Sequence, residues 1–305
     1  MKTYAKNTVL LTEALDVLQA EQPCTLRQLY YRLISRGALP NKQSAYAALG
    51  RLMTRARERG MFSKRWIVDH TRATLKPSSW SGLNDFGDTV RNVYRKDFWA
   101  SLDHHIEVFV EKDAIAGTIQ PVTHEYDVAL RVCRGYSSVS FAGEIADEWR
   151  DIQKPIHAFY LGDYDPSGFD IERDLREKLA RYSGRTCSVD GDDPGCDEFA
   201  WSRLGVVASD FNEFDLIRLP IKVSDCRTNG FRAEHGDHGA EVDAIPPTEL
   251  RRRVTEAIDS HIDVDRWNKL ITVEELERQT MRQMLATLGK AETESSFGFE
   301  SGVAQ

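Results

Sequence analysis

Apolar residues recur at helical spacing through the first 60 positions of the chain, and they predict three helices. The first helix covers residues 8–20. The second begins after Thr25, a suitable N-cap, and ends at Gly37. The third covers residues 43–59. The next stretch, RWIVDHTR (65–72), reads as a short strand pair or an extended wing.

From residue 105 the pattern changes to an alternation of strands and helices. Three runs rich in β-branched and aromatic residues predict strands: IEVFVE (106–111), VALRVC (128–133) and HAFYLG (157–162). Each run is followed by an amphipathic stretch that predicts a helix, at 114–125, 139–150 and 168–182. Strands separated by single helices indicate βαβ units on a parallel sheet. The predicted fold class is therefore α/β.

Charge is divided unevenly along the 305 residues. The net charge is −8, yet residues 1–76 hold 14 lysines and arginines against 5 acidic residues, while the other 229 residues hold 26 against 43. A basic head on an acidic body suggests an anionic partner for the head. Three helices and a β segment in a basic stretch of ~75 residues are the pattern of a winged helix-turn-helix, so double-stranded DNA is the expected partner. The acidity of the body could be surface solubility, or it could surround a cation site.

Composition excludes several classes of protein. Apolar residues make up 41% of the chain, enough to bury a core. No run approaches the ~18 consecutive apolar residues of a membrane-spanning helix, and the first residues lack the apolar run of a signal peptide. The five cysteines never form a C-x-x-C pair, which argues against a disulfide framework and a four-thiolate zinc site. We expect a cytoplasmic, nucleoid-associated protein with reduced thiols and no membrane partner.

The second helix, LRQLYYRLISRG (26–37), holds a candidate nucleophile. Its core stripe includes Tyr30, whereas Tyr31 is turned ~100° away from that stripe. Tyr31 shares a face with Arg27, four residues earlier. An outward tyrosine beside an arginine could attack a phosphate that the arginine steadies. The alternative is one core tyrosine beside one boundary tyrosine.

The third helix carries a row of basic residues opposite its apolar side. Arg51, Arg55 and Arg59 fall at i, i+4 and i+8, without acidic residues on the same row. Such a row suits the phosphates along a DNA groove, because the guanidinium fork matches phosphate oxygens. The alternative is a solvated charged face.

Carboxylates stand at the ends of two predicted strands. Glu111 ends the first strand in VFVEKDA, and Asp163 and Asp165 end the third in YLGDYDPSG. Residues two apart on an extended chain point to one side, and ligand sites in such sheets lie beyond the carboxyl ends of strands. Three carboxylates without His or Cys suit Mg²⁺. The alternatives are helix caps and turns, with Asp113 and Asp165 as caps.

Two further motifs compete with this interpretation. Asp163-x-Asp165-x-Ser167-Gly168 also matches the start of an EF-hand calcium loop, but a strand precedes it and Pro166 interrupts it. The run His235-Gly-Asp-His238 could bind a metal, although such a run is more often a polar loop.

The predicted organisation has four parts. Residues 1–76 form a winged-helix DNA-binding domain, and 77–103 a connector with one helix at 85–95. Residues 104–290 form a metal-binding α/β domain, in which 186–247 are irregular and helices follow at 248–260 and 273–288. The last residues, 291–305, are expected to be disordered.

With these residues in view, the chain resembles the A subunit of DNA topoisomerase VI and the related meiotic double-strand-break proteins, and more broadly a Toprim protein. TLRQLYY (25–31) is similar to the motif that ends in the family's catalytic tyrosine. VFVEKDA (108–114) is similar to the Toprim glutamate strand, and GDYDPSGFDI (162–171) to the aspartate motif. SRLGVVASDF (202–211) and AEVDAI (240–245) resemble later family segments, from which no catalytic role is carried over.

The resemblance implies a Mg²⁺-dependent, DNA-cleaving transesterase with a winged-helix domain and a Toprim-like domain. Tyr31 would be the nucleophile, Arg27 would steady the phosphate, and Glu111, Asp163 and Asp165 would hold the metal ion. It also implies a homodimer, in which the tyrosine of one protomer works with the metal site of the other, and allows for a separate ATPase subunit. Two other functions stay open: a Toprim nuclease that uses metal-activated water, and a non-catalytic DNA-binding subunit.

Overall fold

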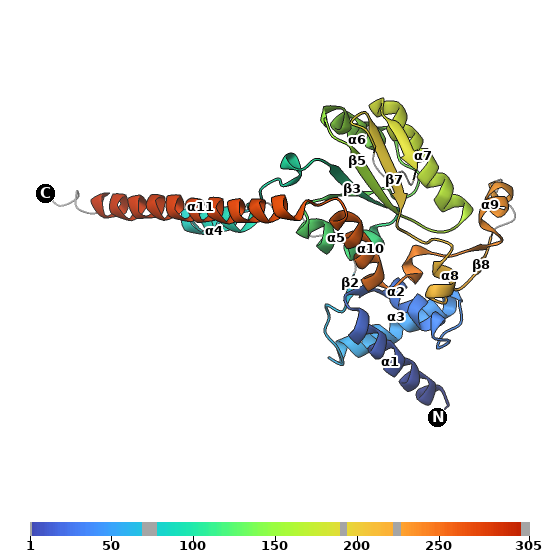
Figure 1. The fold of residues 1–305 in the computed structure, drawn as a ribbon. Helices are drawn as coiled ribbons and strands as arrows, with labels where there is room; N and C mark the ends of the chain where they lie inside the picture. The colour runs from blue at the N-terminus through green and yellow to red at the C-terminus, as the bar shows by residue number, and fades with distance from the viewer. Residues whose placement is uncertain (1, 69–77, 190–193, 222–226, 300–305) are drawn as a thin grey trace. The chain divides into compact units, whose positions relative to one another are not determined.

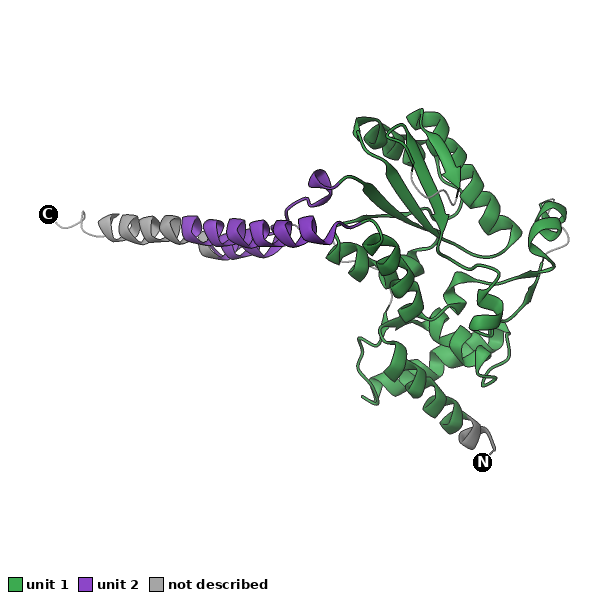
Figure 2. Ribbon diagram, in the orientation of Figure 1, with its two compact units in different colours: residues 1–72, 103–261 green, residues 73–102, 262–305 purple. Residues whose placement is uncertain are grey.

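The computed structural model describes residues 2–68, 78–189, 194–221 and 227–299. The chain divides into two compact units (Figures 1 and 2). Unit 1 comprises residues 1–72 and 103–261, and unit 2 comprises residues 73–102 and 262–305. The basic head and the strand-rich body therefore belong to one unit. These boundaries group the segments differently from the four parts expected from sequence.

The head contains the three predicted helices. These are α1 (Lys2–Glu21), α2 (Leu26–Ser35) and α3 (Gln43–Glu58). Thr25 is the N-cap of α2, as predicted: its side chain accepts from the Gln28 backbone N–H, and the Gln28 side chain accepts from the Thr25 N–H at 2.7 Å. Gly37, which follows α2, has φ of 70°, a conformation that favours glycine.

The β segment after α3 differs from the expected strand pair. Ile67–Val68 forms β2, which pairs in parallel with β1 (Cys24–Thr25), just before α2. Residues 69–72, the rest of the expected wing, lie outside the described residues. The described part of this segment therefore pairs with a strand that precedes α2.

The body is built on a five-stranded parallel sheet, so the α/β prediction is confirmed. Its strand order is β4-β3-β5-β7-β6. The strands are β3 (His105–Val110), β4 (Ala129–Val132), β5 (Ile156–Leu161), β6 (Thr186–Val189) and β7 (Glu198–Arg203). The expectation that 186–247 is irregular is wrong, because this segment supplies β6 and β7. The pattern of this segment, rich in Asp and Gly, did not indicate these two short strands, of which β7 pairs with β5 and β6 pairs with β7.

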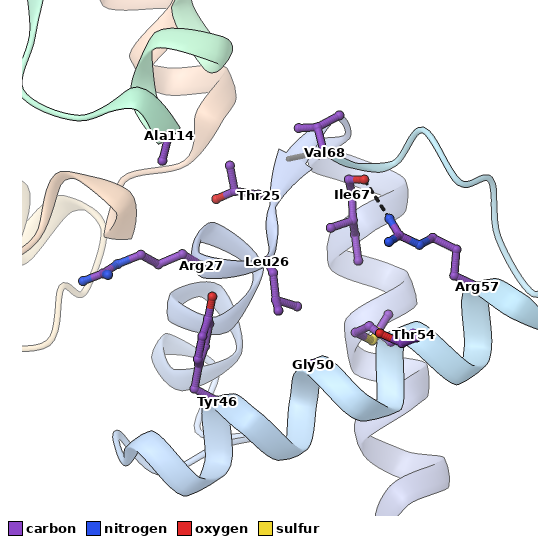
Figure 3. Close-up of a pocket in the computed structure, with 11 residues that line it drawn as sticks. Thr25, Leu26, Arg27, Tyr46, Gly50, Thr54, Arg57, Ile67, Val68 and Ala114 are labelled. Atoms are coloured by element: carbon purple, nitrogen blue, oxygen red, sulfur yellow. Dashed lines mark hydrogen bonds between the residues drawn. The ribbon is translucent and has the colours of Figure 1, made fainter. Parts of the chain in front are cut away.

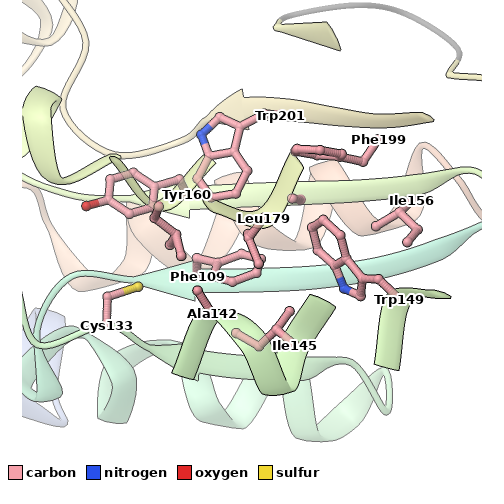
Figure 4. Packing of buried hydrophobic residues seen from close by; sticks show 12 residues of the cluster. Phe109, Cys133, Ala142, Ile145, Trp149, Ile156, Tyr160, Leu179, Phe199 and Trp201 are labelled. Atoms are coloured by element: carbon pink, nitrogen blue, oxygen red, sulfur yellow. The ribbon is translucent and has the colours of Figure 1, made fainter. Parts of the chain in front are cut away.

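Helices cover both faces of the sheet (Figure 1). They are α5 (Asp113–Glu125), α6 (Val139–Asp151), α7 (Pro166–Ser183) and α10 (Pro247–Asp259). The main hydrophobic core lies between the sheet and the pair α6 and α7 (Figure 4). Phe109, Tyr160 and Trp201 extend from three neighbouring strands toward Trp149 and Leu179 of these helices. This packing fixes the carboxyl ends of β3 and β5, where the predicted acids lie.

Short elements connect the sheet to α10. They are α8 (Asp210–Glu213), β8 (Leu219–Pro220), α9 (Thr228–His235), β9 (His238–Gly239) and the 3₁₀ turn η2 (Val242–Ala244). Tyr164 and Ala240 exchange backbone hydrogen bonds of 2.8 and 2.9 Å. The AEVDAI segment is thereby held against the loop that follows β5.

Unit 2 is helical. It contains α4 (Leu83–Val93), the 3₁₀ turn η1 (Trp99–Ser101) and α11 (Val264–Phe299). The Trp267 ring of α11 packs against Phe98 and Trp99, and Glu277 accepts from Tyr94 at 2.5 Å. The helix expected at 85–95 is thus α4, and residues 291–299 of the expected disordered tail belong to α11. Among the described residues, no helix is long and apolar enough to cross a membrane.

Candidate functional site

Glu111 and Asp163 lie together at the carboxyl ends of adjacent strands, as predicted. Glu111 directly follows β3, and its Oε2 accepts a 2.9 Å hydrogen bond from the Asp163 backbone N–H. Gly162 permits this approach, because a Cβ there would lie 2.8 Å from Glu111 Oε2 and 2.5 Å from the Tyr160 ring. Both acidic side chains are buried. The strand ends therefore bring two of the three predicted metal ligands into contact.

Asp165 has a different partner. Its carboxylate caps α7 by accepting from the Gly168 N–H at 2.7 Å, which is the role of the structural alternative. Gly168 is required here, because a Cβ would lie 2.4 Å from the Asp163 carbonyl oxygen. Asp165 nevertheless lies close enough to Glu111 to contribute to raising the pKa of that carboxyl. A strand precedes this loop, which is unlike an EF-hand.

Three residues without a role in the sequence prediction complete the acidic site: Lys112, Glu241 and Asp243. The Lys112 ammonium lies 2.7 Å from an Asp163 oxygen and 3.4 Å from oxygens of both Glu241 and Asp243. The Val242 N–H donates to Asp163 Oδ1 at 2.9 Å. The turn η2 and the residue before it, Glu241, therefore supply two further carboxylates and one backbone donor. The spacing of Glu241 and Asp243, two residues apart as in Asp163 and Asp165, was the available signal.

The carboxylates carry more negative charge than the local cations balance. Burial, and then the nearby Asp163, raise the pKa of Glu111 to about 7. Burial also raises the pKa values of Asp163 and Asp243. Burial alone would lower the pKa of Lys112, but the surrounding carboxylates outweigh it and raise this pKa. The site is thus a partly buried region that favours added positive charge.

Arg27 and Tyr31 approach this site from the head. Arg27 is ion-paired with Glu241, and its Nε lies 3.6 Å from Asp243 Oδ2. Its guanidinium carbon lies 5.9 Å from the centre of the Tyr31 ring. Glu241 lies close enough to the Tyr31 hydroxyl for its negative charge to raise the pKa of that group. The predicted pairing of Tyr31 with Arg27 is therefore present.

The expectation that Tyr31 faces solvent is wrong. Only 7% of this residue is exposed, because the side of α2 that turns away from the head core packs against the body. Burial, and then the negative charge of Glu241, raise the pKa of the Tyr31 hydroxyl. Helical spacing separated the faces of α2 correctly, but it could not identify what covers the second face.

The donor atoms of the site fit the chemistry of Mg²⁺, which prefers oxygen ligands. The buried Oδ1 of Asp243 has no hydrogen-bond partner among the described residues. However, no group of three or more His, Cys or carboxylate side chains in the described part of the chain is arranged to hold a metal ion. The Lys112 ammonium lies among the carboxylates, so a metal ion would require this side chain to move.

The predicted DNA-binding arginines lie on the surface of the head. Arg51 and Arg55 are exposed along α3, and Arg59 is exposed at its C-cap. Within the described ranges, none of the three guanidinium groups forms an ion pair. Arg57, in contrast, donates to the Ile67 carbonyl at 2.9 Å and holds β2. The arginine row is therefore free to contact an anion, whereas Arg57 has a structural contact.

A cavity of about 420 Å³ lies between the head and the first turn of α5 (Figure 3). Apolar and polar groups of α2 and α3 line it, together with Ala114 of α5. Arg27 also belongs to its wall, and Figure 3 shows this side chain extending from α2 away from α3. The cavity therefore gives access to the region beside Arg27.

The first histidine of the run His235-Gly-Asp-His238 has a packing role. His235 ends α9, and its ring lies 4.2 Å from that of Phe169 and 5.0 Å from that of Phe231. Burial lowers the pKa of His235. The run therefore joins the end of α9 to β9, and His235 packs among aromatic rings, which differs from the polar loop of the alternative.

Comparisons with known proteins assign the chain to no family: no protein-family model matches it, and no curated protein matches it at a significant level.

Proposed function

We propose that the protein is a Mg²⁺-dependent, DNA-cleaving transesterase similar to the topoisomerase VI A subunit. Its head would act as a winged-helix domain and its body as a Toprim-like domain. One observation carries the proposal: ion pairs lead from Arg27, whose guanidinium lies beside the Tyr31 ring, through Glu241 and Lys112 to Asp163. A nucleophile, cations and carboxylates are the groups that phosphoryl transfer requires.

The head would bind DNA through its exposed arginine row. Arg51, Arg55 and Arg59 would contact the backbone phosphates of double-stranded DNA. Arg27 would steady the reacting phosphate, and for this it must exchange its contacts with Glu241 and Asp243 for phosphate oxygens. The adjoining cavity gives an approach to Arg27.

In the reaction, the Tyr31 oxygen would form a bond to phosphorus, and the bond from phosphorus to one sugar oxygen would break. The phenol loses its proton, for which the neighbouring Glu241 carboxylate would be the acceptor, and the sugar oxygen leaves as a hydroxyl after gaining a proton from solvent. The number of phosphodiester bonds is conserved. Glu111, Asp163 and Asp165 would hold Mg²⁺, which when bound neutralises charge on the phosphate.

A second candidate is a Toprim nuclease in which water attacks the phosphate. Its support is the burial of Tyr31 and the raised pKa of its hydroxyl, which make the phenolate less available at neutral pH. In that case the same acids would act, but the DNA ends would be free.

A denaturing gel of end-labelled DNA after incubation with protein and Mg²⁺ separates these functions. We expect a protein–DNA adduct with the wild type and none with Tyr31→Phe, while DNA binding persists. Cleavage by Tyr31→Phe with free ends would support the nuclease. Binding without cleavage by the wild type, unchanged in Glu111→Gln, would support a non-catalytic subunit and contradict both enzymes.

Tyr30→Phe is the matched control, although the hydroxyl that it removes has a structural contact. The Tyr30 hydroxyl accepts from the Lys42 N–H at 2.8 Å and lies 3.0 Å from the Lys42 carbonyl oxygen, so it pins the turn between α2 and α3. Its loss should lower the free energy of unfolding by about 1 to 3 kcal/mol. The control should therefore still form the adduct at a temperature where it is folded.

A further inference from the structure

We propose that Lys112 exchanges between two positions: its ammonium neutralises the acidic site in the free protein, and it contacts a DNA phosphate once Mg²⁺ has replaced it among the carboxylates. This inference rests on the proposed function, because it concerns the same cation and the same DNA. It gives a role in the reaction to a side chain for which the sequence pattern indicated none.

The Lys112 ammonium engages the whole carboxylate of a proposed metal ligand. It lies 2.8 Å from Asp163 Oδ1 and 2.7 Å from Asp163 Oδ2, and Oδ1 also accepts from the Val242 N–H. The ammonium is 3.4 Å from oxygens of Glu241 and Asp243 as well. A positive group among oxygen donors of three carboxylates is what a divalent cation would replace. Asp163 therefore cannot bind a metal ion until Lys112 has left it.

The site can accept more positive charge than one ammonium supplies. The Asp243 side chain is completely buried, and its Oδ1 has no hydrogen-bond partner among the described residues. Glu111 lies on the other side of Asp163, whose backbone N–H it accepts at 2.9 Å. A divalent ion carries twice the charge of the ammonium, so exchange of Lys112 for Mg²⁺ lowers the repulsion among these carboxylates.

Lys112 can leave the carboxylates without a change in the backbone. It is the N-cap residue of α5, which fixes its main chain, while its long side chain is 26% exposed. Arg27, 47% exposed, is ion-paired with Glu241, which Lys112 also contacts. The two cations therefore lie on either side of one carboxylate and are both accessible to solvent. A lysine and an arginine so close together suit the oxygens of one phosphate.

Calorimetric titration with Mg²⁺ tests the first position of Lys112. We expect Lys112→Met to bind Mg²⁺ at least about tenfold more tightly than the wild type, because no nearby charge has to be displaced. The matched control is Lys178→Met, which removes the same charge from an ion pair with Asp174 on α7 and should bind as the wild type does. Equal or weaker binding by Lys112→Met, or no binding by either chain, would overturn the exchange.

Labelling of lysine amines in the wild type tests the same point without a variant that must fold. Acetic anhydride modifies free amines, and mass spectrometry of the peptides gives the rate at each lysine. An ammonium paired with carboxylates reacts slowly, so acetylation of Lys112 should be at least about tenfold faster in Mg²⁺ than in EDTA. Lys178 should react at one rate in both solutions. An unchanged rate at Lys112 would contradict its displacement.

The salt dependence of DNA binding tests the second position. Both chains carry Tyr31→Phe, so that no adduct forms, and fluorescence anisotropy reports binding of a short duplex. In Mg²⁺, Lys112→Met should lower the slope of log affinity against log salt by about 1, because one phosphate contact is lost. In EDTA the slope should be unchanged, because the acids hold Lys112. A slope that is unaffected in Mg²⁺, or equally lowered in both solutions, would refute the phosphate contact.

These experiments separate failure of the inference from failure of the proposed function. If the wild type forms no protein–DNA adduct, the transesterase proposal fails, yet titration and labelling still decide whether Lys112 exchanges with Mg²⁺. If the adduct forms and Lys112→Met binds Mg²⁺ no more tightly, the transesterase proposal stands and the exchange is refuted.

Discussion

At the level of single residues, one guanidinium group holds the loop that carries Asp163. Arg203, at the end of β7, donates to the Gly162 carbonyl at 3.0 Å and also to the Asp163 carbonyl. It is ion-paired with the buried Glu172 and lies over the Phe169 ring at 4.3 Å. Because the hydrogen bonds from Arg203 fix the backbone of this loop, the Asp163 carboxylate keeps its direction toward Lys112.

Replacing Arg203 should destabilise the fold strongly. Arg203→Met leaves Glu172 as a buried charge without its cation, which costs about 3 to 5 kcal/mol of unfolding free energy. The matched control is Arg173→Met on α7, whose exposed ion pairs are worth at most about 1 kcal/mol. Urea unfolding of the two variants measures the difference. Equal losses would contradict the role given to Arg203.

Removing one carboxylate should weaken cation binding without loss of the fold. We expect Asp163→Ala to reduce Mg²⁺ affinity at least about tenfold in calorimetric titration, because one of the donors is lost. Removing charge from a repelling cluster need not destabilise it. Asp113→Ala, which removes a half-exposed acid paired with Arg134, should bind as the wild type does. Equal binding by the wild type and an alanine variant of Glu111, Asp163 and Asp165 would exclude this site.

At the level of elements, α3 has one side that packs in the head and another that exposes a row of arginines. Leu49, Met53 and Ala56 are buried in the head, whereas the arginine row is exposed on another side of the helix. A helix with one apolar stripe and an opposite basic row can rest on its own domain and still reach a phosphate backbone.

This arrangement predicts the salt dependence of DNA binding. Removing one arginine that neutralises a phosphate should lower the slope of log affinity against log salt by about 1, so Arg51→Gln with Arg55→Gln should lower it by about 2. The decrease in affinity should be similar for different DNA sequences. Arg173→Gln with Arg252→Gln removes the same charge from paired, exposed sites on the body and serves as the control. Fluorescence anisotropy at several salt concentrations measures the slopes, and equal slopes in both double variants would exclude the α3 row.

At the level of the whole molecule, a cluster of three histidines links stability to pH. His157 is the second residue of β5 and is buried, with its Nε2 3.1 Å from His104 Nδ1 and its ring 3.9 Å from that of His261. Burial, and then these two neighbours, lower the pKa of His157 to about 3. Between about pH 6.5 and 3 the unfolded chain therefore binds a proton at this position that the folded chain does not.

Proton linkage gives the direction in which the stability changes with pH. Stability from His157 is present above about pH 6.5 and is lost as the pH falls, by about 1.4 kcal/mol per pH unit. His157→Leu should remove this part of the acid sensitivity, whereas His124→Gln, at an exposed position, should keep it. Urea unfolding at a series of pH values from 7 to about 4 gives both slopes. A His157→Leu profile parallel to that of the wild type would refute the assignment.

The sequence by itself determined the features that depend on neighbouring residues. Thr25 caps α2 because the capping interaction spans only three residues. Glu111 and Asp163 follow strands whose apolar runs are visible locally, and parallel strands bring their carboxyl ends to one edge. The α/β class, and the contact between these two acids, were therefore predictable.

Only the tertiary structure decided which strands pair and which distant residues contact the candidate site. The strands β6 and β7 have weak local patterns and are ordered by pairing with β5 and with each other. Glu241 joins the site because η2 is held against the β5 loop, and Tyr31 is buried because the outer face of α2 docks on η2. Periodicity tells which face of a helix is distinct, but the partner of that face is set by contacts across more than 200 residues.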